Sequence, residues 1–200
     1  EEATNEALVK AAVSNFGGLH ILVPAAGFCN DTVIQKMSLD VFRQMVQIHM
    51  EAPWMLCRAA YPALKEGNKD GIIRKVILIS SEAGSRGNAG QSNYGAAKGG
   101  VIGLMRVLAK EWLRIRVNCN CIAYGFVDTR LTQATCGDTI MGAAIGMPGG
   151  IRSAAEQAVE ARGGRILTPE EAAGGIFCLS IPQSDGINGQ LVEIDGGVGI

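Results

Sequence analysis

Short apolar runs alternate with longer amphipathic segments along this chain. Four runs have the length and composition of buried parallel strands, at 19–23, 76–79, 115–122 and 189–194. Apolar residues at helical spacing predict helices over 1–16, 38–64 and 94–113, and a further helix opens at 168. This alternation predicts an α/β protein in one domain over residues 1–200, with a doubly wound parallel sheet and helices on both faces.

The two longest predicted helices each carry an apolar stripe. We expect Pro53 to kink the first helix or open one of its turns, because proline lacks the backbone N–H. The predicted inward residues of the first helix are Val41, Met45, Ile48, Ala52, Met55 and Ala59. Those of the second helix are Ala97, Val101, Leu104, Met105 and Leu108.

A polar, glycine-rich stretch at 80–98 contains the strongest candidate chemistry. Tyr94 and Lys98 are four residues apart at the front of a predicted helix, so they share one of its faces. A free phenol titrates near pH 10, and a cation nearby favours the phenolate. We therefore expect Lys98 to lower the pKa of Tyr94 and make it a useful acid or base.

Ser81 stands at the end of the 76–79 apolar run, thirteen residues before Tyr94. The carboxyl end of a parallel strand faces the crevice in which open α/β sheets bind ligands. The Ser81 hydroxyl is therefore predicted to lie in the same crevice as Tyr94 and Lys98. The residues between Ser81 and Tyr94 are mostly glycine and polar, as expected for an active-site loop.

Ser81, Tyr94 and Lys98 together resemble the short-chain dehydrogenase/reductase family, whose pattern pairs a serine with Y-x-x-x-K. The stretch S-N-Y-G-A-A-K-G-G-V is most similar to the 3-oxoacyl-[acyl-carrier-protein] reductase branch, an activity of fatty acid biosynthesis. The resemblance implies a Rossmann-like fold and hydride transfer between NAD or NADP and a carbonyl or secondary alcohol. It also implies that Tyr94 donates the proton, Lys98 holds the nicotinamide ribose and Ser81 bonds the carbonyl oxygen.

Three further stretches resemble the same family. Pro24-Ala25-Ala26-Gly27 stands where the family has N-N-A-G, which implies that Ala26 and Gly27 contact the cofactor, although a simple turn fits equally well. Residues 123–129 resemble P-G-x-x-x-T, with a tyrosine in place of the proline. The resemblance implies that Gly125, Val127 and Thr129 hold the cofactor there. The closing N-G-Q-L-V-E-I-D-G-G resembles the family's last strand.

His49 occupies the position at which the family carries an asparagine that orders water beside the catalytic lysine. Imidazole also donates and accepts hydrogen bonds, but it is bulkier and it titrates near neutral pH. His49 is therefore a candidate catalytic residue. A buried histidine without a catalytic role fits the sequence as well.

The phosphate-binding element of the family has no match in this chain. No G-x-x-x-G-x-G turn occurs near residue 1, so we expect the fold to lack the family's first strands and Gly-rich phosphate loop, as in an N-terminally truncated or degenerate member. The strand at 19–23 would then form an exposed edge. The alternative function is a catalytically silent chain that acts, if at all, through subunit association.

Composition excludes several other classes of protein. With 18 basic and 19 acidic residues the net charge is -1, which favours neither nucleic acid nor a membrane surface as a partner. No apolar run reaches about 18 residues and no signal peptide is visible, so a cytoplasmic location is expected, or an organellar one if a targeting segment preceded residue 1. The family resemblance implies a homo-oligomer, a tetramer or dimer, with an interface on the two long helices.

The six cysteines show no metal-binding spacing, and only two histidines are present, so no metal site is expected. We expect the cysteines to be reduced, small core residues: Cys29, Cys57, Cys119, Cys121, Cys136 and Cys178. The segment 131–165 has weak periodicity before 153–161. A mobile lid over a small-molecule substrate is the preferred interpretation, with an ordinary surface loop as the alternative.

Overall fold

The computed structural model describes residues 2–135 and 137–198, and its centre is a four-stranded sheet. The strands are β1 (Ile21–Leu22), β2 (Arg74–Ser81), β3 (Val117–Tyr124) and β6 (Leu191–Ile194). All pair in parallel, in the order β1-β2-β3-β6. The predicted doubly wound parallel sheet is confirmed, and β1 lies at its edge within the described part of the chain.

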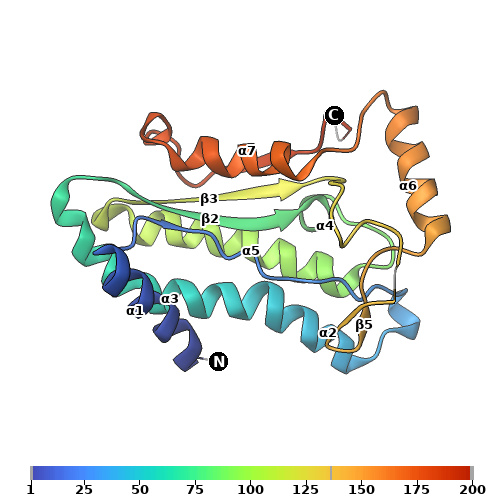
Figure 1. Ribbon diagram of the computed structural model, residues 1–200, viewed down its shortest axis with the longest axis horizontal. Helices are drawn as coiled ribbons and strands as arrows, with labels where there is room; N and C mark the ends of the chain where they lie inside the picture. Colours follow the sequence, from blue (N-terminus) through green and yellow to red (C-terminus); the bar gives the residue numbers. More distant parts are fainter. Residues whose placement is uncertain (1, 136, 199–200) are drawn as a thin grey trace.

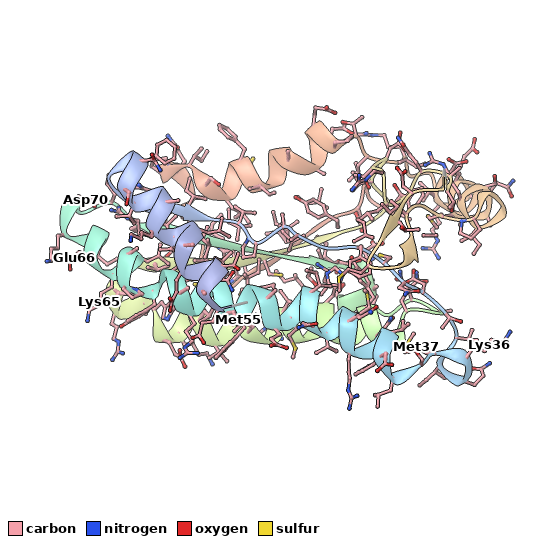
Figure 2. All side chains as sticks on the ribbon, turned by 60° about the horizontal axis from the view of Figure 1, so that its bottom comes forward. Lys36, Met37, Met55, Lys65, Glu66 and Asp70 are labelled. Atoms are coloured by element: carbon pink, nitrogen blue, oxygen red, sulfur yellow. The ribbon has the colours of Figure 1, made fainter. Side chains whose placement is uncertain are left out.

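Helices cover the two faces of the sheet unequally (Figure 1). On one face, α5 (Ser92–Glu111) lies against β2 and β3, and α3 (Ala52–Gly67) lies beside it. The helix α1 (Glu2–Phe16) packs on α3, and Met55 of α3 lies in the groove between them (Figure 2). On the other face, α7 (Pro169–Ser180) packs against β2 and β3.

The largest apolar cluster fills the space between the sheet and α3 with α5. It includes Val76 and Leu78 of β2, Cys119 and Cys121 of β3, and Met105 of α5, all buried. A smaller cluster around Ile77, Ile122 and Leu179 lies under α7. Alternate residues of β2 therefore face opposite layers, as expected for a sheet covered on both faces.

The helix predicted over 38–64 opens one turn just before Pro53, as expected. The chain forms α2 (Leu39–Val46), a π-helical turn η2 (Gln47–Glu51), and then α3, which begins just before Pro53. A proline there cannot donate to the preceding turn, and the wider turn accommodates it. The inward stripe is also displaced: Met45 is buried as predicted, but the other fully buried positions are His49, Pro53, Cys57, Ala60 and Leu64.

Capping residues define where two of the helices begin. The Ser38 hydroxyl accepts from the Val41 N–H at the start of α2. At α7, Thr168 and Glu171 form a reciprocal capping box, with proline at the first helical position. The helix predicted from Thr168 is therefore confirmed.

The remaining elements connect these strands and helices. They are η1 (Ile34–Lys36), η3 (Asn68–Asp70), α4 (Glu82–Ser85), η4 (Leu113–Ile115), β4 (Thr139–Ile140), β5 (Ala143–Ala144), α6 (Gly149–Ala161) and η5 (Pro182–Ser184). The predicted strands differ in their bounds: β2 is longer, β3 is shifted, β6 is shorter and β1 keeps only two residues. The segment 131–165 contains a β4–β5 hairpin, and its helix begins at Gly149, four residues earlier than predicted.

The cysteine prediction holds for three residues. Cys57, Cys119 and Cys121 are buried free thiols, whereas Cys29 is half-buried and Cys178 is exposed on α7. Cys136 lies outside the described residues.

Candidate active site

One cavity of about 1180 Å³ opens at the carboxyl ends of the strands. All nine residues predicted for the site line it: Ala26, Gly27, His49, Ser81, Tyr94, Lys98, Gly125, Val127 and Thr129. They come from four separate parts of the chain, namely the segment after β1, the π-helical turn, the β2–α5 region and the turn after β3. The predicted common crevice is therefore present.

Ser81 is the last residue of β2 and caps the short helix α4. Its hydroxyl accepts from the Ala83 N–H at 3.3 Å and lies 3.4 Å from the Tyr124 carbonyl oxygen, to which it donates. It also lies close enough to the Tyr94 phenol to lower the pKa of that group. The strand end and the α4 cap thus hold the Ser81 hydroxyl toward the phenol.

Tyr94 lies in the first turn of α5, where its electrostatic surroundings differ from those expected. Burial raises its pKa above the ordinary value of 10, nearby Cys29 and Asp31 raise it further, and Ser81 lowers it. Lys98 is not a cause of any lowering. The expectation that Lys98 makes this phenol more acidic is therefore wrong for this arrangement. Burial destabilises the phenolate more than the neighbouring groups stabilise it.

Lys98 is turned toward the sheet. Its Nζ donates to the Ile79 carbonyl oxygen at 2.7 Å and lies 5.5 Å from the centre of the Tyr94 ring. The side chain is only 6% exposed, and burial lowers its pKa from 10.5 to about 8. The amine therefore lies over the ring, and it is still mostly protonated at pH 7.

Close backbone contact fixes α5 against the end of β2. The Ser80 hydroxyl donates to the Lys98 carbonyl oxygen at 2.9 Å. A Cβ added to Gly84 would lie 2.6 Å from the Lys98 carbonyl carbon, so only glycine fits between α4 and α5. This contact sets the position of Tyr94 and Lys98 relative to Ser81.

His49 lies in the π-helical turn and is almost fully buried. Its ring meets the Tyr94 ring edge to face, with centres 4.9 Å apart and planes at 85°. Burial, with the charge of Lys98, lowers its pKa to about 4, so the imidazole is neutral at pH 7. The structure places this residue against Tyr94, and its replacement of the family's asparagine stays a prediction.

Sequence reasoning missed four polar residues that surround Tyr94. Asn93 is completely buried and bonds both to the Asn30 carbonyl oxygen and to the Tyr94 N–H. Gln91 donates to Asp31 at 2.6 Å, and Asp31 lines the cavity. These contacts join parts of the chain about 60 residues apart, and the only local signal was the unusual density of polar residues before Tyr94.

The turn after β3 approaches the cavity closely. A Cβ on Gly125 would lie 2.8 Å from the Cβ of Asp195, so glycine is required there. Tyr124, which stands where the family has proline, donates from its hydroxyl to the Ala172 carbonyl oxygen at 2.7 Å. This bond to α7 anchors the turn in place of the rigid proline ring.

The segment predicted as a lid forms the outer wall of the cavity. Its lining side chains are mostly apolar, among them Leu131, Met147, Ile151, Ala155 and Val159. Arg152 ties α6 to the preceding turn, donating to Asp128 at 3.2 Å and to the Thr132 carbonyl oxygen at 2.9 Å. The placement over the cavity agrees with the lid interpretation, while its mobility stays a prediction.

Among residues 2–135 and 137–198, no group of three or more His, Cys, Asp or Glu side chains is arranged to hold a metal ion. No described helix combines the length and the apolar character needed to cross a membrane.

Comparison with known proteins places these features in context. A family model described as "Enoyl-(Acyl carrier protein) reductase" matches residues 1–199. The chain is 31% identical to the 3-oxoacyl-[acyl-carrier-protein] reductase FabG of Vibrio cholerae, over 96% of this chain and 72% of that protein. It is 33% identical to the 3-oxoacyl-[acyl-carrier-protein] reductase of Synechocystis, over 96% of this chain and 69% of that protein.

A solved structure shares the fold. It is the 3-ketoacyl-(acyl-carrier-protein) reductase from Brucella melitensis complexed with NADH, with a TM-score of 0.84 and 22% sequence identity. The match covers 100% of this chain and 75% of that one. The α/β architecture with a parallel sheet is therefore that of a known reductase fold.

Proposed function

Because the chain belongs to the short-chain dehydrogenase/reductase family, we propose that it is an NAD- or NADP-dependent oxidoreductase that interconverts a carbonyl group and a secondary alcohol. The observation that carries this proposal is the meeting of Ser81, Tyr94 and Lys98 in one cavity at the carboxyl ends of the strands. Three side chains from two elements converge there, and Ser81 lies close enough to the phenol to affect its pKa.

The residues present fit the nicotinamide end of such a cofactor. The cavity exceeds the range of about 300–1000 Å³ typical of small-ligand sites, so it has room for a substrate beside a flat ring. Ala26, Gly27 and Gly125 line it and are proposed to contact the cofactor. Lys98 and Thr129 provide donors for ribose and carboxamide oxygens. The bound nicotinamide supplies the hydride for reduction.

Tyr94 is proposed as the proton donor. Because its pKa is raised, the phenol keeps its proton at neutral pH and can give it to an oxygen that becomes negative during reduction. The Ser81 hydroxyl is proposed to donate a hydrogen bond to the same oxygen, which stabilises the developing charge. Lys98, close to its own pKa, is proposed to hold the cofactor ribose and to return a proton toward Tyr94.

The proposed substrate is a 3-oxoacyl thioester, as the names of the relatives indicate for those proteins. Support comes from the outer wall, where apolar side chains of α6 such as Ile151 and Ala155 offer a surface for an acyl chain. Fatty acid synthesis in the cytoplasm is the setting that this substrate implies.

Self-association is part of the proposal. Trp54 on α3 is 47% exposed and Val107 on α5 is 50% exposed, on the two long helices that form subunit interfaces in the family. A homodimer or homotetramer would bury these side chains. The competing possibility is a catalytically silent chain that acts only through such contacts.

Turnover with a short-chain 3-oxoacyl thioester tests the proposal. The chain is mixed with NADPH or NADH and acetoacetyl-coenzyme A, and loss of nucleotide absorbance is followed. Oxidation that depends on both the thioester and the protein supports the oxidoreductase. No oxidation with either nucleotide, from a chain that is folded by circular dichroism, would favour the silent alternative.

A further inference from the structure

Two buried side chains bond to alternate carbonyl oxygens of the segment that follows β1. His49 Nε2 lies 2.6 Å from the Phe28 carbonyl oxygen, and Asn93 Nδ2 donates to the Asn30 carbonyl oxygen at 2.9 Å. One side chain comes from the π-helical turn and the other from the first turn of α5. The segment 28–30 is therefore held from both sides by side chains far away in the sequence.

The same two side chains also contact Tyr94. Asn93 Oδ1 accepts from the Tyr94 N–H at 2.7 Å, and the His49 ring meets the phenol ring edge to face at 4.9 Å. His49 is 3% exposed and Asn93 is 0% exposed, so water cannot replace a lost partner without local rearrangement. Each side chain thus links the segment 28–30 to Tyr94 through contacts that are costly to break.

The hydrogen bond to Phe28 fixes the tautomer of His49. A carbonyl oxygen only accepts, so Nε2 carries the proton, and in the neutral ring Nδ1 does not. Nδ1 is buried and has no protein partner among the described residues, which agrees with an unprotonated nitrogen. Gly27 leaves the space for the ring, since a Cβ there would lie 2.3 Å from His49 Cε1.

We propose that His49 and Asn93 are positioning residues that clamp the segment 28–30 against Tyr94 and thereby set where the phenol lies in the cavity. The segment brings Cys29 and Asp31 to the cavity wall beside Tyr94. His49 acts here through the position of Tyr94, not by relaying protons itself. The consequence for catalysis rests on the proposed function, whereas the clamp is a property of the folded chain.

Nuclear magnetic resonance of histidine-labelled protein tests the clamp without any turnover. The chain has two histidines, and His20→Asn identifies the signal of the other. We expect His49 to be neutral and protonated on Nε2 at pH 7. This measurement does not require a substitution of His49. A proton on Nδ1 instead would overturn the proposal, because the bond to Phe28 would then be absent.

Variants test whether the two contacts work together. Asn93→Asp keeps the shape but replaces the donor to Asn30, and His49→Phe keeps a ring without a donor. Both are expected to shift the Tyr94 ring signals, assigned with Tyr94→Phe. Asn93→Asp is also expected to speed exchange of the His49 Nε2 proton, and the exposed control Asn15→Asp is not. Unchanged Tyr94 signals in both variants would overturn the clamp.

Kinetics separates positioning from stability alone. A misplacement of about 1 Å costs roughly 100-fold in rate, so His49→Phe and Asn93→Asp are each expected to lower kcat by about 10- to 100-fold, with a smaller change in KM. His49→Gln, whose amide can donate to Phe28, is expected to recover part of the loss. The double variant should be little worse than either single variant, and additive losses would contradict a shared clamp.

The two proposals fail in different ways. If the unmodified chain reduces no carbonyl, the proposed function is wrong, and the histidine tautomer and Tyr94 signals still decide the clamp. If turnover is present and the signals do not respond to the variants, the clamp alone is wrong.

Discussion

The inner and outer walls of the cavity are built in different ways. On the inner wall Lys98 is 6% exposed, and Ser81 and Tyr94 are held by a strand end, a helix start and bonds to backbone atoms. On the outer wall Ile151 is 57% exposed, and the described residues of the segment 131–148 have only the two short strands of the hairpin as regular structure. Buried strand and helix ends thus position the reacting groups. A few polar contacts hold the outer wall, which is the surface offered to a substrate.

This difference has a functional meaning. Proton transfer requires atoms placed within fractions of an ångström, which packed elements provide, whereas substrate entry requires a wall that moves. We therefore expect changes in the inner wall to act on kcat and folding stability, and changes in the outer wall to act on KM. The four predictions below test that division.

The largest effect is expected from Tyr94→Phe on the inner wall. Removing the proposed proton donor should lower kcat by about 10²- to 10⁴-fold, the usual contribution of a positioned acid, with little change in stability. Steady-state reduction of a 3-oxoacyl thioester measures this loss. Tyr61→Phe, a change within the apolar cluster under the sheet, is the control and should leave kcat unchanged. Equal turnover by Tyr94→Phe would remove Tyr94 from the mechanism.

The buried amine of Lys98 should make stability depend on pH. Burial lowers its pKa from 10.5 to about 8, so between these pH values the unfolded chain binds a proton that the folded chain does not. The free energy of unfolding of the unmodified chain should therefore rise with pH in this window relative to Lys98→Met, on the order of 3 kcal/mol in total.

Denaturant unfolding of both chains across this pH window measures the change in the stability gap. Lys110→Met, a substitution of an exposed lysine on the same helix, should keep a constant gap to the unmodified chain. If the difference in free energy of unfolding between the unmodified chain and Lys98→Met also stayed constant with pH, folding would not desolvate this amine.

Gly84→Ala should damage the inner wall through the backbone. The new methyl group meets the Lys98 carbonyl carbon at 2.6 Å, so α4 and α5 must separate, at a cost of about 1 to 3 kcal/mol. Gly103→Ala is a matched control, because it lies on α5 with no atom within 4 Å of the new methyl group. That control should gain roughly 0.5 to 1 kcal/mol. Similar unfolding midpoints for the two variants would contradict the close contact.

The smallest effect is expected on the outer wall, from Arg152→Met. Its contacts with Asp128 and Glu156 are partly exposed, so their loss should lower folding stability only slightly. If these contacts hold the substrate wall, KM should rise about fivefold while kcat changes little. Arg130→Met, at an exposed neighbouring position, should change neither constant. A fall in kcat without a change in KM would contradict the proposed division between the two walls.

The position of the candidate site could be predicted because its signals are local. Ser81 ends an apolar run, and Tyr94 and Lys98 are spaced by one helical turn, so strand and helix periodicity bring them to one crevice. The length of β2 could not be predicted in the same way. It begins with Arg74 and Lys75, whose charges argue against burial until their partners Asp70 and Asp185 are seen at 2.7 and 2.5 Å.

The electrostatics of the site and its supporting contacts could not be predicted from spacing. The pKa of Tyr94 depends on how much protein surrounds it, which no four-residue interval reveals. The bonds from Asn93 to Asn30 and from Gln91 to Asp31 join distant segments and leave no periodic trace. The π-helical turn that aims His49 is likewise invisible in the pattern, although Pro53 marked the place where the helix changes.

Binding of reduced nucleotide to the unmodified chain tests the central claim most directly. Titration with NADH and with NADPH is followed by nucleotide fluorescence and compared with Lys98→Met, which lacks the amine proposed to hold the ribose. The account predicts saturable binding in the micromolar range for at least one nucleotide, weakened in the variant. No binding of either nucleotide to the folded chain would contradict an oxidoreductase site in these residues.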